Sequence, residues 1–140
     1  MIEVGNIVTV NGQPGLWVVA RAAPGEHPPR TRWRVWIERD GRRFERLVGI
    51  GDLVVMRRPT FVNGENISHD GIAAEVIADG GDDVVLNLPS RSHRHRGANV
   101  NLHLTAGRIV VGKADLVLEN LKLLLKGNRD DDNQAVTVSP

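Results

Sequence analysis

The sequence contains no cysteine and no long apolar run, and both absences limit what the protein does. Without cysteine the chain forms no disulfide and no zinc or iron–sulfur site built on thiolates. No apolar run approaches the roughly 20 residues that a membrane-spanning helix needs. The first residues also lack the basic-then-apolar pattern of a signal peptide, so we expect a protein that acts without export.

Enzyme signatures are missing as well. There is no glycine-rich phosphate-binding loop, no nucleophile elbow and no HExxH metal-binding motif. The acidic run Asp130-Asp131-Asp132 lacks the spacing and the closing glutamate of a calcium-binding EF-hand loop. We therefore predict a protein that is not an enzyme and that needs no cofactor.

Lysine is scarce, and charge is distributed unevenly along the chain. Every basic residue before position 113 is an arginine. Residues 1–60 hold ten arginines and six acids, or +4, whereas residues 61–140 hold eight basic and eleven acidic residues, or −3. The net charge of +1 lacks the basic excess of most nucleic-acid-binding domains. Complementary halves instead favour head-to-tail attraction between copies.

An internal repeat organises the sequence. The stretch Val48-Gly49-Ile50-Gly51-Asp52-Leu53-Val54-Val55 returns as Val111-Gly112-Lys113-Ala114-Asp115-Leu116-Val117-Leu118, with five of the eight positions identical. Each copy closes a segment of short apolar runs and turns. Such self-similarity is the sequence signature of repeated structural units. We predict two related β-modules that share an interface, because a module of about 60 residues buries little surface by itself.

The first module, residues 1–58, shows strand patterns separated by turn signals. Asn11-Gly12 and Asp40-Gly41 are strong hairpin signals. Residues 21–32 are rich in proline and are expected to form a long loop. In the strand that follows, Trp33, Val35 and Ile37 alternate with polar residues and are predicted to face the core.

The second module is assigned to residues 71–127, after a linker at 59–70 and before a C-terminal extension at 128–140. Residues 89–97 are expected to form a loop, followed by an alternating strand at 100–104. After Asp115 two patterns compete. Apolar spacing fits a helix, but the first copy of the repeat favours a strand at 115–118 followed by a second strand or a short helix. Ala135–Val138 has the composition of a terminal strand.

The strands Gly5-Asn6-Ile7-Val8-Thr9-Val10, Gly15–Val19 and Trp33–Ile37, together with Asp52-Leu53-Val54, resemble a Src-homology-3-type small barrel. Such barrels often open with G-x-x-V-x-V and close on D-L-V. The resemblance covers most of residues 3–57 and extends to 71–119, and it implies binding and scaffolding roles. Tandem, cysteine-free β-modules with a terminal extension are also similar to structural proteins of tailed-phage particles, such as capsid decoration or head–tail junction proteins.

Trp36 is the first candidate for partner binding. If Trp33 and Val35 point inward, Trp36 points outward between Arg32 and Arg34. Tryptophan and arginine are enriched at the energetic centres of protein interfaces. Stacking of Trp36 on nucleic-acid bases is the alternative, and we favour the protein interface.

A basic segment is the second candidate: Arg91, His93, Arg94, His95 and Arg96. With His103, its histidines are the only metal-like cluster in the sequence, but no acid completes a ligand set and the arginines repel a cation. We therefore predict no metal site. The segment is expected to contact an acidic protein surface or solvent, and phosphate binding is the alternative.

These observations predict an all-β protein of two tandem small barrel or sandwich modules, with a C-terminal helix or an extra strand. The expected function is non-enzymatic: a virion component, assembled in the host cytoplasm, that binds capsid or other virion protein and its own copies. The alternative is a nucleic-acid-associated barrel that uses the Arg32, Arg34 and Trp36 face with the 91–96 segment.

Overall fold

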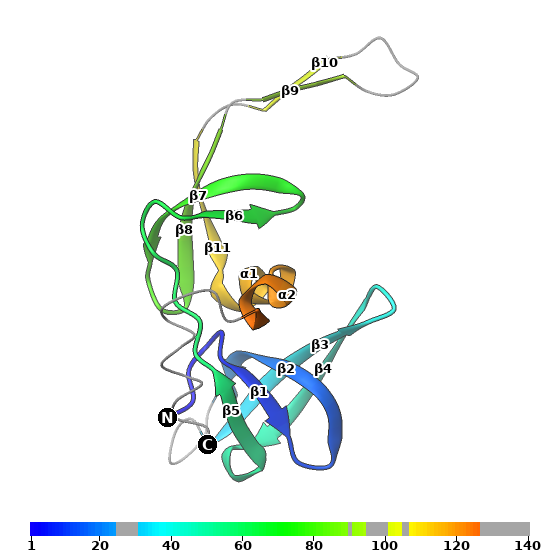
Figure 1. Cartoon of the computed structure of the whole chain (residues 1–140). Helices are drawn as coiled ribbons and strands as arrows, with labels where there is room; N and C mark the ends of the chain where they lie inside the picture. The colour runs from blue at the N-terminus through cyan, green and yellow to red at the C-terminus, as the bar shows by residue number, and fades with distance from the viewer. Residues whose placement is uncertain (25–30, 90, 95–100, 105–106, 127–140) are drawn as a thin grey trace.

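The structure is a computed structural model that describes residues 1–24, 31–89, 91–94, 101–104 and 107–126. It is built mainly of antiparallel β-strands, with two short helices near the C-terminus (Figure 1). The predicted all-β fold of two modules is confirmed. The expected terminal strand at Ala135–Val138 and most of the proline-rich segment, residues 25–30, lie outside the described residues.

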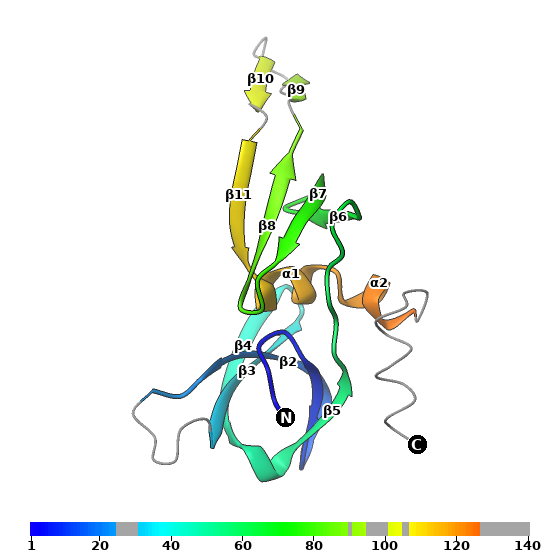
Figure 2. The same cartoon turned by 90° about the vertical axis from the view of Figure 1, so that its left-hand side faces the viewer.

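The first five strands form one antiparallel sheet in the order β4-β3-β2-β1-β5. They are β1 (Ile7–Val10), β2 (Gln13–Ala22), β3 (Arg32–Arg39), β4 (Arg42–Gly49) and β5 (Leu53–Arg57), with a 3-10 turn, η1 (Ile50–Asp52), before β5. Figure 2 shows the sheet curling around an interior. The Asp40-Gly41 turn has φ values of 53° and 73°, as a two-residue hairpin turn requires.

The interior of this barrel is lined by alternate residues of its strands. Trp33, Val35 and Ile37 are buried as their alternation predicted, and Trp17 from β2 packs with them. The Trp17 indole N–H donates to the Pro14 carbonyl oxygen at 3.3 Å, which satisfies its one polar group. Local period-two patterning therefore determines this core.

The second sheet has the order β11-β8-β7-β6, from β6 (Asn66–His69), β7 (Ile72–Asp79), β8 (Asp83–Leu88) and β11 (Gly107–Gly112). Strand β6 lies inside the segment assigned to a linker, so the boundary at residue 71 was wrong. The Asp70-Gly71 pair that looked like an end of the linker is the β6–β7 hairpin turn, with φ values of 50° and 77°. The four residues of β6 pair with β7 from Asn66 opposite Glu75 to His69 opposite Ile72.

A separate two-stranded ribbon continues the second sheet outward. It consists of β9 (Arg91–Arg94) and β10 (Asn101–Leu104). The strand expected at 100–104 is present as β10 over residues 101–104, and Val100 lies outside the described residues. The expected loop at 89–97 is a strand over four of its residues, because β9 finds a partner in β10 with Arg94 opposite Asn101.

The strand expected at 115–118 was wrong: that segment is helical. Helix α1 spans Lys113–Glu119 and α2 spans Leu121–Leu125, so the short helix left open for the end of the module is present. Figure 1 places both helices between the two sheets. Leu116, Val117 and Leu124 are fully buried there. The apolar side chains of the two helices therefore contact apolar surface on more than one side.

The two copies of the repeat adopt the same structure only at their first two residues. Strands β4 and β11 occupy the same place in two four-stranded meanders, β4-β3-β2-β1 and β11-β8-β7-β6, and Val48-Gly49 and Val111-Gly112 end them. In the first copy the chain then continues as β5 and pairs with β1. In the second copy it becomes α1, so β5 has no counterpart in the second sheet.

One apolar core joins the two modules. It combines Ile7 and Val18 from the first sheet with Ile67 and Leu86 from the second, and α1 and α2 fill the space between them. The modules therefore share an interface, as small domains require.

Candidate functional site

Trp36 points away from the barrel interior, as predicted, but it is not the exposed ring that the sequence suggested. Its indole N–H donates to Glu45 Oε1 at 2.8 Å, and the Arg43 guanidinium lies 4.4 Å from the ring centroid. The ring is half-buried against the core between the modules. Sequence alternation gave the correct strand face but could not show that other elements cover it.

Glu45 binds positively charged side chains that surround Trp36. The Arg34 guanidinium donates to Glu45 Oε2 at 3.3 Å, and Arg21 lies 3.6 Å from Oε1. The hydrogen bond from Trp36 is the largest reason that the pKa of Glu45 is lowered from its ordinary value, and the two arginines act in the same direction. Arg34 and Trp36 therefore already have an internal partner. Arg32, an exposed residue at the start of β3, also makes an interaction within the chain.

The other side of this cluster is tied to the second module. Arg43 on β4 donates to Asp115 Oδ1 on α1 at 3.0 Å. The face of the first sheet that carries Trp36 is thus part of the interface between the two modules, which we call the seam. Arg43 stacks on Trp36 and is also bound to α1.

A buried ion pair forms the centre of the seam. Lys113 is only 7% exposed, and its Nζ lies 2.9 Å from Asp79 Oδ2. The Lys113 side chain crosses Gly5, where a Cβ would lie 2.9 Å from its Cγ, and Gly5 has a φ of +89°. Only glycine combines that backbone conformation with this close approach. Lys113 thereby connects the N-terminal segment to the second sheet.

The basic segment overlaps a projecting arm, defined here as β9 and β10. Figures 1 and 2 show β9 and β10 beyond the ends of β8 and β11, at the far side of the second sheet from the barrel. Arg91, His93 and Arg94 lie on β9, whereas His95 and Arg96 lie outside the described residues. Residues 89–107 contain three arginines, three histidines and no acid.

Backbone register separates two of the arm histidines. His93 is opposite Leu102, and His103 is opposite Ser92. The two histidines are therefore not cross-strand partners, and this register gives no reason to revise the prediction of no metal site there.

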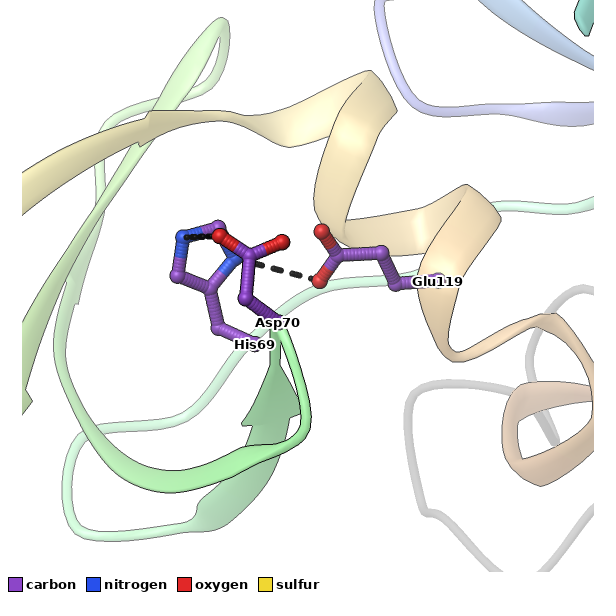
Figure 3. A group of neighbouring side chains, drawn as sticks. All are labelled: His69, Asp70 and Glu119. Atoms are coloured by element: carbon purple, nitrogen blue, oxygen red, sulfur yellow. Dashed lines mark hydrogen bonds and ion pairs between the residues drawn. The ribbon is translucent and has the colours of Figure 1, made fainter. Parts of the chain in front are cut away.

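A second histidine cluster was not predicted from the sequence. His69, Asp70 and Glu119 come together where the β6–β7 turn meets the end of α1, as Figure 3 shows. The His69 Nδ1 atom lies 3.1 Å from Glu119 Oε2, and its Nε2 atom lies 3.4 Å from Asp70 Oδ2. Because Glu119 is 50 residues from His69, no local signal connects them.

The geometry of this cluster favours a clasp over a metal site. The two carboxylates face different nitrogens of one imidazole ring, whereas a metal ion would bind a single ring nitrogen and need both carboxylates beside it. The ring instead bridges them and ties the β6–β7 turn to α1. We therefore assign the cluster a structural role.

A basic and aromatic surface lies on β4, on the side away from the seam. We call it the β4 surface and define it by Arg42, Phe44 and Arg46, which occupy alternate positions of the strand. The three residues border a hollow of about 550 Å³ that also contacts Trp17 and Arg39. This surface was not predicted from the sequence, although the alternation of Arg42, Phe44 and Arg46 along the strand was an available signal.

A larger hollow, of about 810 Å³, lies between the barrel and the helices. Its apolar lining comes from Leu16, Ile37, Leu118, Leu121 and Leu123, and charged side chains of both signs surround it. This mixture of charges does not select a class of ligand.

Comparison with protein-family models, with curated proteins and with solved structures finds no match to this chain. Among the described residues, neither helix has the length and apolar character needed to cross a membrane.

Proposed function

We propose that the chain is a non-enzymatic structural protein that binds an acidic protein surface through its arm. The observation that carries this proposal is a basic β-ribbon that projects from the second sheet and packs mainly on itself. Its sequence supplies arginine and histidine without a neighbouring acid to neutralise them. Such a ribbon complements a negatively charged partner.

The stability of the ribbon supports a binding role. An isolated two-stranded hairpin is only marginally stable in water, because it has no sheet or helix to bury its faces. Contact with a partner would supply that missing surface. Binding would therefore stabilise β9 and β10, which is the behaviour expected of an interaction element.

The rest of the molecule supports the arm as a rigid base. Strands β8 and β11 pair continuously from Asp83 opposite Gly112 to Leu88 opposite Gly107, directly below the arm. Both modules contribute to the core beneath them. Binding elements act with greater specificity when a packed scaffold positions their first residues.

A tailed-phage virion, which the sequence resemblance suggests, is the setting that we propose for this function. Capsid or other virion protein, and further copies of the chain, are then the protein partners. A repeated lattice would present the same acidic surface to many copies, so that a weak single contact becomes stable through multivalency.

Nucleic-acid binding is the second candidate, because the major groove of duplex DNA admits a two-stranded β-ribbon. The arm alone favours this alternative. The Arg34 and Trp36 part of it is weakened, since Glu45 already binds both side chains. With a net charge of +1, we expect weak duplex binding at physiological salt.

Charge reversal in the arm tests both candidates. The double substitution Arg91→Glu with Arg94→Glu is compared with Lys122→Glu with Lys126→Glu, which makes the same change in net charge on α2 and beside it. Full-length protein is titrated with candidate capsid protein and with poly-L-glutamate, and complexes are measured by light scattering. We expect the arm variant to bind at least about tenfold more weakly and the control to bind like the wild type.

The same variants are then titrated with fluorescent duplex DNA and RNA at several salt concentrations. Submicromolar, strongly salt-dependent binding that only the arm variant loses would replace the protein partner with nucleic acid. Unchanged binding of the arm variant to the acidic protein probes would remove the arm from the function.

A further inference from the structure

We propose that the β4 surface binds the acidic C-terminal segment of a second copy of the chain, which adds to β4 as an extra strand. The occupant is the segment 128–138, with Asp130-Asp131-Asp132 followed by Ala135-Val136-Thr137-Val138. This inference concerns self-assembly and is independent of the arm.

Strand β4 has the backbone that such pairing requires. It is the terminal strand of the first sheet and pairs with β3 alone, from Arg42 opposite Arg39 to Gly49 opposite Arg32. Its outer edge therefore presents unpaired N–H and C=O groups along eight residues. An exposed edge of this kind is a template for an added strand from another chain.

The side chains of β4 select which strand is added. Within the described part of the chain, neither Arg42 nor Arg46 has a carboxylate at salt-bridge distance. The Arg42 guanidinium instead lies 5.9 Å from the centroid of Phe44, a ring that is 44% exposed. Two acids also border the hollow: Asp40, in the β3–β4 turn, and Glu45, whose carboxylate is bound by Trp36 and Arg34.

Charge on an edge strand normally prevents indiscriminate pairing. Here the two arginines repel a basic or neutral strand from the edge and favour an acidic one. Phe44 between them adds an apolar contact, and arginine with an aromatic ring is a frequent combination at interface centres. The β4 surface therefore fits an extended segment that carries carboxylates and aliphatic side chains.

The C-terminal segment has this composition. In an extended chain, Asp130 and Asp132 lie on one side, and Val136 and Val138 lie on that same side. The carboxylates complement Arg42 and Arg46 in charge, and Val136 and Val138 have the β-branched side chains that favour an added strand. The contact also joins the basic half of one copy to the acidic half of the next, +4 against −3.

The contact is heterologous, because the two copies contribute different surfaces. Each copy then has one free β4 surface and one free tail, so assembly continues into a ring or a filament. This mode of assembly suits a protein that acts in repeated copies.

A charge swap in the full-length chain tests the inference. One variant carries Arg42→Glu and Arg46→Glu, and the other carries Asp130→Lys and Asp132→Lys. Each is measured by size-exclusion chromatography with light scattering over a range of concentrations. We expect wild-type protein to increase in mass with concentration, and each variant to raise the concentration needed by at least about tenfold.

Mixing the two variants is the decisive step. In the mixture the acidic β4 surface of one variant meets the basic tail of the other, and the unchanged tail of the first meets the unchanged β4 surface of the second. Mixing should therefore restore assembly at concentrations at which each variant alone stays monomeric. Because Arg42 and Arg46 are exposed, we expect their substitution to leave the fold unchanged. Circular dichroism checks that both variants keep the wild-type fold. The Lys122→Glu with Lys126→Glu protein matches the charge change of the β4 variant and should assemble like the wild type.

Three outcomes would overturn the inference. Wild-type protein that is monomeric at every concentration leaves no second copy to bind. Assembly that both variants retain would place the contact elsewhere. Assembly that Arg91→Glu with Arg94→Glu abolishes and that the β4 substitutions leave intact would assign self-association to the arm. Failure of the arm to bind acidic protein has no bearing on these results.

Discussion

Lys113 and Asp79 form a buried ion pair within the second module, and the stem of Lys113 crosses Gly5 of the first module. Asp79 accepts hydrogen bonds from the backbone N–H groups of Phe61 and Gly81 as well as from Lys113. The two carboxylate oxygens thus bind three different segments of the chain. A buried charge pair is strongly destabilised when one partner is removed, because the other is left without compensation.

Replacing Lys113 by methionine tests this pair while keeping most of the apolar stem that crosses Gly5. We expect the substitution to lower the free energy of unfolding by about 3 kcal/mol, the lower end for a broken buried pair, since Asp79 keeps two backbone donors. Urea titration measures the change. Lys122→Met on the exposed side of α2 is the control, and an equal effect of both substitutions would contradict the role of the pair.

The same carboxylate gives the protein an acid-sensitive component of stability. Burial by itself raises the pKa of Asp79, but the hydrogen bonds from Lys113, Phe61 and Gly81 outweigh it and lower the pKa below 3.8, its ordinary value. A group with a depressed pKa in the folded state stabilises the fold fully above its unfolded pKa. That stability is lost as the pH falls through the folded pKa.

We therefore expect the melting temperature to fall as the pH is lowered below about 4, with part of the fall due to Asp79. In Asp79→Asn the protein is less stable at neutral pH, and the difference from the wild type narrows in acid. Melting curves from neutral to acidic pH measure this difference. A constant difference at every pH would show that ionisation of Asp79 contributes nothing.

The two neighbouring tryptophans of β3 are expected to differ in the size of their effects. Trp33→Ala should destabilise the barrel by about 3–5 kcal/mol through loss of core packing. Trp36→Ala should cost about 1–3 kcal/mol, because it leaves Glu45 without its indole donor and opens the seam. Thermal and urea melts of both variants measure these changes. If Trp36→Ala left the melting transition unchanged, Trp36 would behave as the exposed side chain that strand alternation alone predicted.

At the scale of elements, a side chain covers one edge of the second sheet. Strand β6 is a terminal strand, and the Asn120 side chain occupies its edge between α1 and α2. The Asn120 amide donates to the Ser68 carbonyl oxygen at 2.8 Å and accepts from the Ser68 N–H at 3.3 Å. The buried amide thus replaces the strand that β5 provides in the first sheet.

Asn120→Ala should therefore expose an edge and leave buried backbone groups without partners. We expect a loss of about 1–3 kcal/mol in the free energy of unfolding and faster amide exchange at Ser68. Asn66→Ala, at an exposed position of the same strand, is the control. If amide exchange at Ser68 were unaffected, water or another group would have to satisfy the edge equally well.

At the scale of the whole molecule, the shared core predicts that the modules unfold together. Ile7 and Val18 of the first sheet pack in the same cluster as Leu86 of the second and Leu124 of α2. Removal of either module would expose apolar surface on the other. A contiguous core of this kind usually gives one cooperative transition.

Two probes distinguish joint from separate unfolding. All three tryptophans lie in the first module, so their fluorescence reports on the barrel, whereas far-ultraviolet circular dichroism reports on both modules. We expect coincident transitions, and Leu124→Ala in α2 should shift both by about 2–5 kcal/mol. A fluorescence transition that Leu124→Ala leaves in place would show that the barrel is stable by itself.

The sequence by itself determined the local elements of this protein. Asn11-Gly12 and Asp40-Gly41 specify tight turns through backbone conformation alone, and the period of Trp33, Val35 and Ile37 specifies a buried strand face. The repeat identified the two meanders through Val48-Gly49 and Val111-Gly112. These features depend on residues that are close in the chain, so their pattern is legible without a structure.

Only the tertiary structure decided what the outer faces contact. Residues 115–118 become a helix because the space between the modules is apolar on several sides and buries Leu116, Val117 and Leu118. Trp36 is covered because Arg43 is held by Asp115, 72 residues away. His69 and Glu119, and Ser68 and Asn120, meet across 50 and 52 residues. Such contacts depend on how separate elements pack, and no local periodicity encodes them.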